Sequence, residues 1–499
     1  MSIEGNFIDG QVVPSQAQGR YETIDPTHGR VSGRFVEAGP EDIDRAVESA
    51  RQAFRSRWAP MPAAERGKLL MRWGDLIADQ AEEIGRAETR ENGKLLAEMW
   101  TQALAVREWL YYFGGLADKV EGRVVPHSRP NLLNYTLREP LGVIGVITPW
   151  NSPTFLTIMS AAPALAAGNT IVVKPSEITP TSAFLLAKLA FEAGLPQGVV
   201  NVISGGRTAG EALVDHPDVA KIIFTGSEGA GRAIASRCGQ RLIGATLELG
   251  GKSANIVFED ANLDRAEAGL LSGIFAAAGQ TCVAGSRALV HRSIIDEMRE
   301  RLSRRAAAIR VGDPLDERTE MGPVATAAQL DKDESMIRRA IDDGAELVYG
   351  GERASIAGFE NGYFFKPTIV APPKHSDFIM NEEVFGPVLS LYAFDDEDHA
   401  IEVANSTRFA LASGIWTEKL SRAHRVAAQI QAGTVWINTY RSLAPSSPFG
   451  GINASGMGHQ NGQDAIEQYL KTKSVWCELG DDIPDPFVIK TPVRAPFRQ

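Results

Sequence analysis

Residues 141–148 read LGVIGVIT, a short apolar run that is typical of a strand buried on both faces. The pattern returns in NTIVVKP (169–175), GVVNVIS (198–204) and KIIFTG (221–226), with helix-like sequence between the runs. Short apolar strands that alternate with helices predict a parallel sheet covered by helices on both faces. Such sheets bind ligands beyond the carboxyl ends of their strands, so we expect a binding site at that edge.

The pattern extends in both directions along the chain. A second alternating block is predicted from about residue 253 to 447, with the strand-like runs SANIVF, SRALVH and GTVWIN. Residues 41–115 are predicted to be mostly helical, because their apolar positions are spaced for one buried face. Residues 123–140 are predicted to form two extended segments around a turn at 128–131, and the tail from about Lys471 is expected to pair with them, within or between subunits.

Composition limits the classes of function. The 499 residues suggest two or three domains, and a formal net charge of -11 argues against a nucleic-acid partner, because phosphate would be repelled. The N-terminus has no signal-peptide pattern, and the longest apolar stretch, 155–168, is too interrupted to span a bilayer. Cys238, Cys282 and Cys477 are too few and too scattered for a disulfide framework or a zinc site. We therefore expect a cytoplasmic protein with no metal and no membrane partner.

Two motifs at predicted strand ends suggest a dinucleotide. FTGSEGAG (224–231) places Gly226 and Ser227 between a strand and a helix, whose free N–H groups suit a pyrophosphate, although the motif also fits a plain tight turn. VVKPSE (172–177) brings Lys174 and Glu177 to a strand end, where Glu177 would accept from a ribose 2′-hydroxyl and repel a 2′-phosphate. This charge favours NAD over NADP. A solvated charged loop is the alternative for this second motif.

Three residues are candidates for catalysis. Glu248 is the one acid in the apolar run TLELGGKS (246–253), where burial would raise its pKa and suit a general base; a surface-facing position is the alternative. Asn151 in TPWNSP (148–153) is a candidate oxyanion donor or part of a Pro-Asn turn. Cys282 lies in AAAGQTCVAGSR (276–287) and is either a nucleophile or a packing residue. No histidine lies within a few residues of it, which weakens a Cys–His hydrolase interpretation.

Taken together, these stretches resemble the NAD(P)-dependent aldehyde dehydrogenase superfamily of the hydrolytic type. TPWN, KPSE, FTGS, LELGGK, GQTC, EEVFGP (382–387) and PFGG (448–451) occur in the order and approximate spacing of that family, and Glu248 stands 34 positions before Cys282. The resemblance implies an α/β fold with a Rossmann-type cofactor domain, an α/β catalytic domain and a small β oligomerisation unit. These parts are assigned to residues 1–122 with 141–249, residues 250–454, and residues 123–140 with 470–499.

The resemblance also implies roles for individual residues. Cys282 is the expected nucleophile, Asn151 with the Cys282 backbone N–H the expected oxyanion site, and Glu248 the base that activates water. We expect the small residues around Cys282 to admit both substrate and nicotinamide, and this setting to make the thiol reactive without an adjacent histidine. The expected cofactor-binding residues are Thr148, Trp150, Lys174, Glu177, Gly206, Gly210, Gly226, Ser227, Gly231, Glu383 and Phe385. The expected substrate-pocket residues are Ser152, Phe155, Thr281, Val283, Tyr440 and Arg441.

The implied reaction oxidises an aldehyde to the carboxylic acid with NAD, through a thiohemiacetal and a thioester on Cys282, in a homodimer or homotetramer. The chain departs from the family at Ser160, where many members carry lysine, and at Gln460, where many carry glutamate. We expect Glu248 to work here with water alone. Ser152 and Arg441 make the pocket more polar, which favours a small polar or anionic aldehyde or semialdehyde. Glu228 adds an acid at the phosphate helix, which again favours NAD.

Three other functions are weighed against this one. A CoA-acylating semialdehyde dehydrogenase would hand the acyl group to CoA, and the presence of Glu248 argues against it. A cysteine hydrolase would need no dinucleotide, so the ribose and phosphate motifs argue against that class. A catalytically idle binding or structural protein on the same scaffold would have no need to retain Cys282, Glu248 and Asn151 together.

Overall fold

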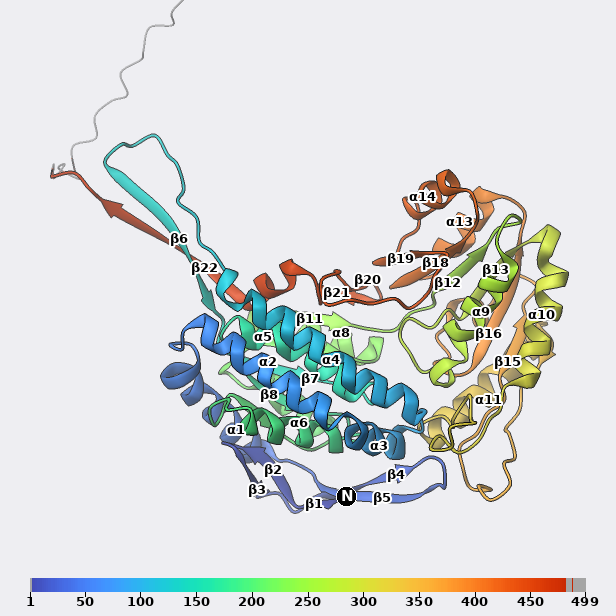
Figure 1. Ribbon diagram of the computed structural model, residues 1–499, viewed down its shortest axis with the longest axis horizontal. Helices are drawn as coiled ribbons and strands as arrows, with labels where there is room; N and C mark the ends of the chain where they lie inside the picture. The colour runs from blue at the N-terminus through green and yellow to red at the C-terminus, as the bar shows by residue number, and fades with distance from the viewer. Residues whose placement is uncertain (1, 482–486, 488–499) are drawn as a thin grey trace, which may run out of the picture.

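The computed structural model describes residues 2–481 and 487, and its centre is an eight-stranded sheet (Figure 1). The strand order is β21-β11-β10-β7-β8-β9-β2-β3, and the five strands from β11 to β9 run parallel. These five are β7 (Val143–Ile147), β8 (Thr170–Lys174), β9 (Val200–Val202), β10 (Val219–Thr225) and β11 (Gly244–Glu248). The four apolar runs are therefore neighbouring parallel strands, as predicted.

Helices cover this sheet on both faces because successive strand residues point to opposite sides. Ile144 and Val146 pack with α2, α4, α5 and α6, whereas Val143 and Ile147 pack with α1, α7 and α8. The helices are α1 (Pro40–Ala53), α2 (Ala63–Asp79), α3 (Ala81–Asn92), α4 (Leu96–Leu116), α5 (Pro153–Ala166), α6 (Thr181–Glu192), α7 (Arg207–Asp215) and α8 (Glu228–Arg241), with a π-helix at Phe54–Trp58 and a 3-10 turn at Ala117–Lys119. The predicted helical region and its buried face are confirmed.

Short antiparallel strands complete the edges of the first sheet. β2 (Gly5–Ile8) pairs with β3 (Gln11–Pro14), and β21 (Gly456–Met457) pairs with β11. A separate three-stranded sheet joins β1 (Ser2–Ile3), β5 (Arg30–Val36) and β4 (Arg20–Asp25).

The second alternating block forms a seven-stranded sheet in the order β14-β15-β16-β13-β12-β18-β19, parallel except for β14. Its strands are β12 (Ala254–Val257), β13 (Arg287–His291), β14 (Glu346–Tyr349), β15 (Thr368–Ala371), β16 (Val388–Phe394), β18 (Ala412–Trp416) and β19 (Thr434–Ile437). The helices are α9 (Leu263–Ile274), α10 (Ile295–Ala308), α11 (Ala327–Asp342), α12 (Phe378–Asn381), α13 (Glu397–Asn405) and α14 (Leu420–Ala427), with 3-10 turns at Ala276–Gly279, Arg292–Ile294 and Gln463–Tyr469. β17 (Phe409–Ala410) pairs with β20 (Ile452–Asn453).

A two-stranded arm projects from the body of the molecule (Figure 1). β6 (Leu132–Pro140) pairs antiparallel with β22 (Leu470–Glu478), from Leu470 opposite Pro140 to Glu478 opposite Leu132, so the expected pairing of the tail is confirmed within one chain. The expected first extended segment also pairs with the second: the Val125 N–H donates to the Asn134 carbonyl oxygen and the Thr136 N–H to the Arg123 carbonyl oxygen, both at 2.8 Å, although the pairing stops at one isolated bridge, between Val124 and Tyr135, and forms no regular strand. Pro126 and Pro130 lack the N–H that a ladder needs. Residues 482–486 and 488–499 of the predicted tail lie outside the described residues.

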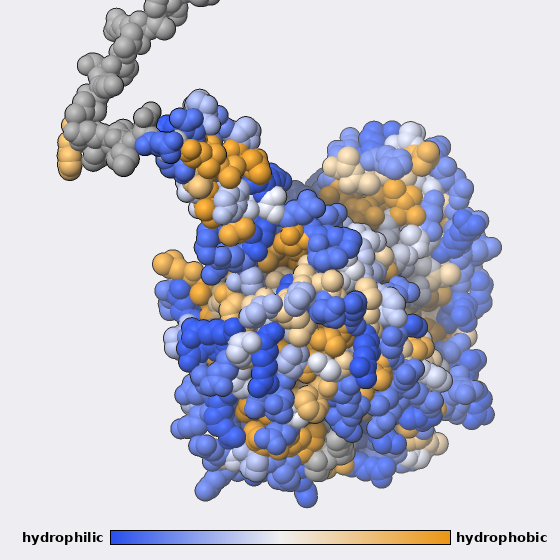
Figure 2. Space-filling view, turned by 60° about the vertical axis from the view of Figure 1, so that its left-hand side comes forward, coloured by the Kyte–Doolittle hydropathy of each residue, from blue (hydrophilic) through white to orange (hydrophobic). Residues whose placement is uncertain are grey.

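Hydrophobic side chains gather on this arm, as Figure 2 shows near the base of the grey trace. Trp476 and Leu479 are 59% and 62% exposed. Within the part of the chain that the structure describes, no helix is both long enough and apolar enough to cross a membrane.

Candidate active site

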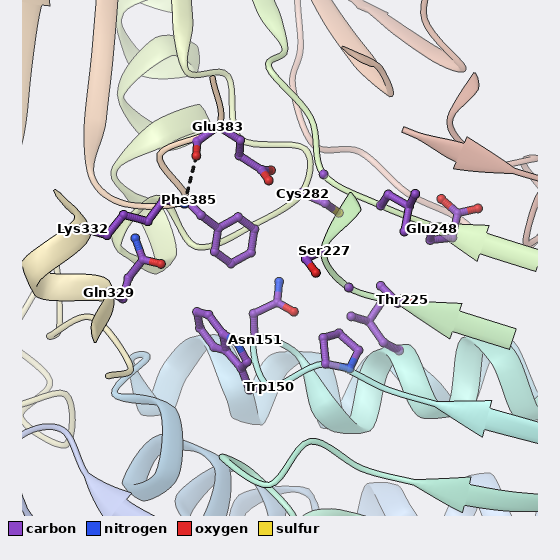
Figure 3. Close-up of a pocket in the computed structure, with 15 residues that line it drawn as sticks. Trp150, Asn151, Thr225, Ser227, Glu248, Cys282, Gln329, Lys332, Glu383 and Phe385 are labelled. Carbon is purple, nitrogen blue, oxygen red and sulfur yellow. Dashed lines mark hydrogen bonds between the residues drawn. The ribbon is translucent and has the colours of Figure 1, made fainter. Parts of the chain in front are cut away.

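Two cavities adjoin at the carboxyl ends of the first sheet's parallel strands, where the sequence predicted a site. The first has a volume of about 220 Å³, and Cys282, Glu248 and Asn151 all line it (Figure 3). The second has a volume of about 540 Å³ and extends past Lys174 and Glu177. Both are lined by Pro149, Trp150, Thr225, Gly226 and Ser227. A ligand that occupied both cavities would bring one end close to Cys282.

The loop before Cys282 has an unusual backbone. Ala277 and Ala278 have φ angles of 57° and 50°, in the left-handed region that residues with a Cβ seldom adopt. The backbone N–H of Ala277 donates to Glu98 Oε1 at 2.8 Å. A Cβ on Gly279 would lie 2.0 Å from the carbonyl oxygen of Gly386, so only glycine allows this close approach. The loop before Cys282 is thus packed tightly against the segment that carries Glu383 and Phe385.

The surroundings of Cys282 disfavour the thiolate form of its side chain. Burial, and next the carboxyls of Glu248 and Glu383, raise the pKa of Cys282 to about 12. A thiolate is the nucleophilic form of cysteine, so this protein without a bound ligand keeps the thiol in its unreactive form at neutral pH. The expectation that the setting makes the thiol reactive stays a prediction, and the raised pKa indicates that the thiolate is disfavoured before a ligand binds.

Glu248 is the last residue of β11 and stands in register with Thr225 of β10. It is 3% exposed, so the prediction of a buried acid is confirmed and the surface-facing alternative is wrong. Among the described residues, neither of its carboxylate oxygens has a hydrogen-bond partner. Burial raises the pKa of Glu248 well above its ordinary value. A carboxyl that is buried without a partner beside a cavity is suited to exchange a proton with water or with a thiol.

Asn151 spans the gap between two loops. Its Nδ2 donates to the carbonyl oxygen of Gln280 at 3.0 Å, and the Gln280 side chain in turn accepts from the Ala325 N–H at 2.8 Å. An amide nitrogen carries two hydrogens, so this bond leaves one donor for the cavity. Figure 3 shows Asn151 and Cys282 facing the same space.

The second cavity has the groups that a dinucleotide would need. Lys174 is buried, donates to the carbonyl oxygen of Gly205 at 2.6 Å and lies 3.5 Å from a half-exposed Glu177 carboxylate. Gly210 lines the same cavity beside the Lys174 side chain, where a Cβ would make an ordinary contact at 3.5 Å. Ser227 caps α8, whose first-turn N–H groups favour an anion. These residues fit NAD. Thr148 and Gly206 also line this cavity, whereas Gly231 lines neither cavity and packs against Leu249.

Glu383 and Phe385 line the first cavity on the side of the second sheet. The Gly251 N–H donates to Glu383 Oε1 at 2.9 Å, and the Phe385 ring meets Trp150 edge-on with a 5.5 Å centroid separation. Gln329 and Lys332 of α11 also line this cavity, and Lys332 Nζ donates to the Glu383 carbonyl oxygen at 3.0 Å (Figure 3). Sequence reasoning missed these two residues, because they lie on an ordinary amphipathic helix.

Glu228 does not present a free negative charge to the phosphate helix. It pairs with Arg232 at 2.9 Å and with Arg408 at 3.0 Å. The electrostatic argument that this acid disfavours an additional phosphate is therefore wrong, since two arginines compensate its charge.

The six residues expected to form the substrate pocket line neither cavity, but most of them lie close to the loop that carries Cys282. Tyr440 Oη donates to the Val283 carbonyl oxygen at 3.0 Å, and Phe155 packs with Cys282 and Tyr440 against one apolar cluster. Arg441 Nη1 donates to the Ser272 carbonyl oxygen at 3.1 Å. Thr281 is buried, whereas Ser152, which precedes α5, is only partly so.

The two positions at which the chain departs from the family meet in the structure. Gln460 Nε2 donates to Ser160 Oγ at 2.9 Å, and both residues are buried. Tyr469 Oη donates weakly to the Ser160 carbonyl oxygen at 3.4 Å. The sequence placed these residues far apart, and the fold joins them as a neutral pair.

Comparison with known proteins agrees with this geometry. The model of the aldehyde dehydrogenase family matches residues 12–475. The (Z)-2-((N-methylformamido)methylene)-5-hydroxybutyrolactone dehydrogenase of Acinetobacter baylyi is 42% identical over 492 residues, which cover 98% of this chain and 99% of that protein. Betaine aldehyde dehydrogenase from Staphylococcus aureus, solved with NAD+, superposes with a TM-score of 0.95 at 35% identity, over 97% of each chain. A point variant of an aldehyde dehydrogenase from Bacillus cereus has a TM-score of 0.93 at 40% identity, over 96% of this chain and 97% of the other.

Proposed function

Because this chain belongs to the aldehyde dehydrogenase family and is an NAD-dependent enzyme that oxidises an aldehyde, we propose that Cys282 is its nucleophile and Glu248 the base that releases the acid. The observation that carries the proposal is that one cavity is lined by a partly buried thiol, a buried carboxyl without a partner and an amide donor. Covalent catalysis, base catalysis and oxyanion stabilisation need these three groups.

The steps follow from the chemistry of these side chains. The Cys282 thiol passes its proton to solvent water and its sulfur bonds to the aldehyde carbon, while Asn151 and the Cys282 N–H hold the carbonyl oxygen as an oxyanion. When NAD is bound, it supplies the acceptor for the hydride of this thiohemiacetal, which leaves a thioester on Cys282. Glu248 then removes a proton from water as the water oxygen attacks the thioester carbon. The carbon–sulfur bond breaks, the carboxylic acid leaves and Cys282 takes up a proton again.

The substrate class that we propose is a small polar or anionic aldehyde or semialdehyde. Arg441 and Ser152 support it, because they add polar groups near the nucleophile loop. Arg441→Met is expected to raise KM about tenfold for carboxylate-bearing aldehydes and to leave short alkyl aldehydes within twofold, as for loss of one partly screened ion pair. NADH absorbance with short alkyl, aromatic, amino and carboxylate-bearing aldehydes tests this. A preference for long alkyl aldehydes would contradict it, and stimulation by CoA would favour the acylating alternative.

The preference for NAD over NADP is assigned to Glu177, whose carboxylate lines the second cavity beside Lys174. Glu177→Gln removes the charge that would repel a 2′-phosphate, and Arg207 in the same cavity remains. We expect kcat/KM for NADP to rise about tenfold and kcat/KM for NAD to fall severalfold, since the site is half-exposed and screened. Steady-state kinetics with both dinucleotides measures the ratio, and an unchanged ratio would show that Glu177 does not select the cofactor.

The neutral Ser160–Gln460 pair leaves Glu248 to work with water alone. A lysine or a glutamate introduced singly would be a buried charge without a partner, which destabilises proteins by about 3–5 kcal/mol. The double variant Ser160→Lys with Gln460→Glu introduces a positive and a negative charge at two positions whose native side chains are 2.9 Å apart. Each introduced charge then has a partner. We expect it to raise the rate of thioester hydrolysis severalfold, as measured by single-turnover release of the acid. An unchanged rate in the folded double variant would show that Glu248 gains nothing from a charged relay.

We propose that the protein assembles into a homodimer or homotetramer through the exposed arm. The arm's exposed hydrophobic side chains support this proposal: Val124, Leu137, Trp476 and Leu479. Sedimentation velocity distinguishes these assemblies from a monomer.

We also propose that residues 1–122 and 141–249 bind NAD, residues 250–454 carry the nucleophile, and residues 123–140 and 470–499 form the arm and tail. The proposed location is the cytoplasm, without a membrane or nucleic-acid partner.

A further inference from the structure

Helix α3 carries two buried carboxyls that each contact the start of another helix. Glu88 and Glu91 are 1% and 3% exposed and lie three residues apart, on one face of α3. The Thr154 N–H, in the first turn of α5, donates to Glu88 Oε1 at 2.7 Å. Thr181, the first residue of α6, donates to Glu91 through its N–H at 3.3 Å and its hydroxyl at 2.5 Å. Each carboxyl thus accepts from a first-turn N–H of α5 or α6 that has no hydrogen-bond partner within its own helix.

These carboxyls are only weakly compensated, by the charge of Lys94, which acts on Glu88 from a distance. Among the described residues neither forms an ion pair, and burial raises the pKa of both, that of Glu91 to about 8. Burying a carboxyl costs free energy of folding. We therefore infer that these contacts serve to position the helices rather than to stabilise the fold. The two helices that they cap begin directly after the loops that line the two cavities.

The α3 contacts fall on both sides of Asn151. Glu88 holds residue 154, and Asn92 Nδ2 donates to the Trp150 carbonyl oxygen at 3.3 Å. The loop between these two points carries Asn151, whose amide reaches the Gln280 carbonyl at 3.0 Å. An oxyanion donor must stay within a fraction of an ångström of its position, because displacements of about 1 Å cost up to about 100-fold in rate. Two anchors on one rigid helix restrain the loop in this way.

The Glu91 contact restrains a different loop. α6 follows the loop after β8; Lys174 at the end of β8 and Glu177 in the loop both line the second cavity. The same helix therefore holds the oxyanion loop through Glu88 and the loop of the second cavity through Glu91. Glu88 also lies close to Ser182 in the first turn of α6, and its charge raises the pKa of Glu91, so the two carboxyls are distinguished by the kinetic quantity that each is expected to change.

We propose that Glu88 is a positioning residue for the Asn151 amide and that Glu91 is a positioning residue for the Lys174–Glu177 loop. This inference rests on the proposed function of Asn151 and on the proposed cofactor site. It concerns α3, no residue of which lines either cavity. Glu88 acts through the backbone of residue 154, and its oxygen is needed there as an acceptor rather than as a charge.

The first experiment separates the two carboxyls by kinetics. Glu88→Ala is expected to slow the pre-steady-state burst of NADH by about 10- to 100-fold with KM for NAD unchanged, whereas Glu91→Ala raises KM for NAD severalfold with the burst at saturating NAD within twofold. Glu88→Gln keeps an acceptor oxygen and should retain most of the burst rate. Glu82→Ala, at an exposed position of the same helix, is the matched control and should change neither quantity. Equal effects of Glu88→Ala and Glu91→Ala on both quantities would overturn the assignment.

A double-mutant cycle tests whether Glu88 acts through Asn151. If it does, Glu88→Ala should slow the burst less than threefold in an Asn151→Ala background, because the donor it positions is already gone. The same loss in both backgrounds would overturn the proposal. If Glu88→Ala does not fold, Asn92→Ala replaces it in the double-mutant cycle. It should likewise slow the burst less than threefold in the Asn151→Ala background. An Asn151→Ala enzyme with a normal burst would refute the proposed function itself, so the two failures are distinguishable.

Discussion

Cys282→Ala is expected to lower NADH formation by about 1,000-fold or more, because removal of a catalytic nucleophile abolishes the covalent route. NAD binding should persist, since Lys174 and Glu177 line the second cavity, which Cys282 does not line. NADH absorbance with an aldehyde panel and calorimetric titration with NAD measure the two effects. Cys477→Ala, which alters an exposed cysteine of the arm, is the matched control and should leave NADH formation unchanged. Equal activity of Cys282→Ala and the native enzyme would disprove the mechanism.

The raised pKa of Cys282 adds a check that needs no substrate. With a thiol pKa of about 12, the thiolate fraction of the enzyme without NAD is small at neutral pH. Alkylation of Cys282 by iodoacetamide should therefore speed up about tenfold for each unit of pH from about 7 to about 10. Cys282→Ala serves as the blank for the other cysteines. A rate that levels off near pH 7 would show that the thiol is already ionised there.

Glu248→Gln is expected to keep the first turnover and to lose the later ones. The thioester should still form and release one NADH per active site, whereas its hydrolysis should slow by about 100- to 10,000-fold without the general base. Stopped-flow absorbance separates this burst from the steady state. Hydroxylamine cleaves a thioester without a general base, so it should restore turnover in the variant. Loss of the burst together with the steady state would instead place Glu248 in the first chemical step.

The same carboxyl sets the expected pH dependence of hydrolysis. Burial raises the pKa of Glu248, so the group is protonated, and unable to accept a proton, over a wider range of low pH than an ordinary carboxyl. The steady-state rate should therefore rise with pH as Glu248 ionises, and the Glu248→Gln variant should lack this rise. A native profile that stays flat from about pH 5 to about pH 9 would contradict a raised pKa at the catalytic base.

Patterns local in the chain predicted most of the fold. The runs from LGVIGVIT to KIIFTG form neighbouring parallel strands, and the site lies at their carboxyl ends, because apolar periodicity and strand direction need no knowledge of distant residues. The two extended segments around the turn at 128–131 were also predicted, but the first pairs only through one isolated bridge, since a regular ladder depends on N–H donors that its prolines lack. The resemblance placed Cys282, Glu248 and Asn151, and one cavity is lined by all three.

The sequence by itself determined the strand and helix pattern, the position of the site and the residue types in it. Only the tertiary structure decided the electrostatic state of that site: the protonated thiol of Cys282, the compensation of Glu228 by Arg408 and the neutral contact of Ser160 with Gln460. It also decided that Glu88 holds the loop of Asn151. Burial, Coulomb interaction and hydrogen bonding depend on separation in space, and these pairs lie far apart along the chain.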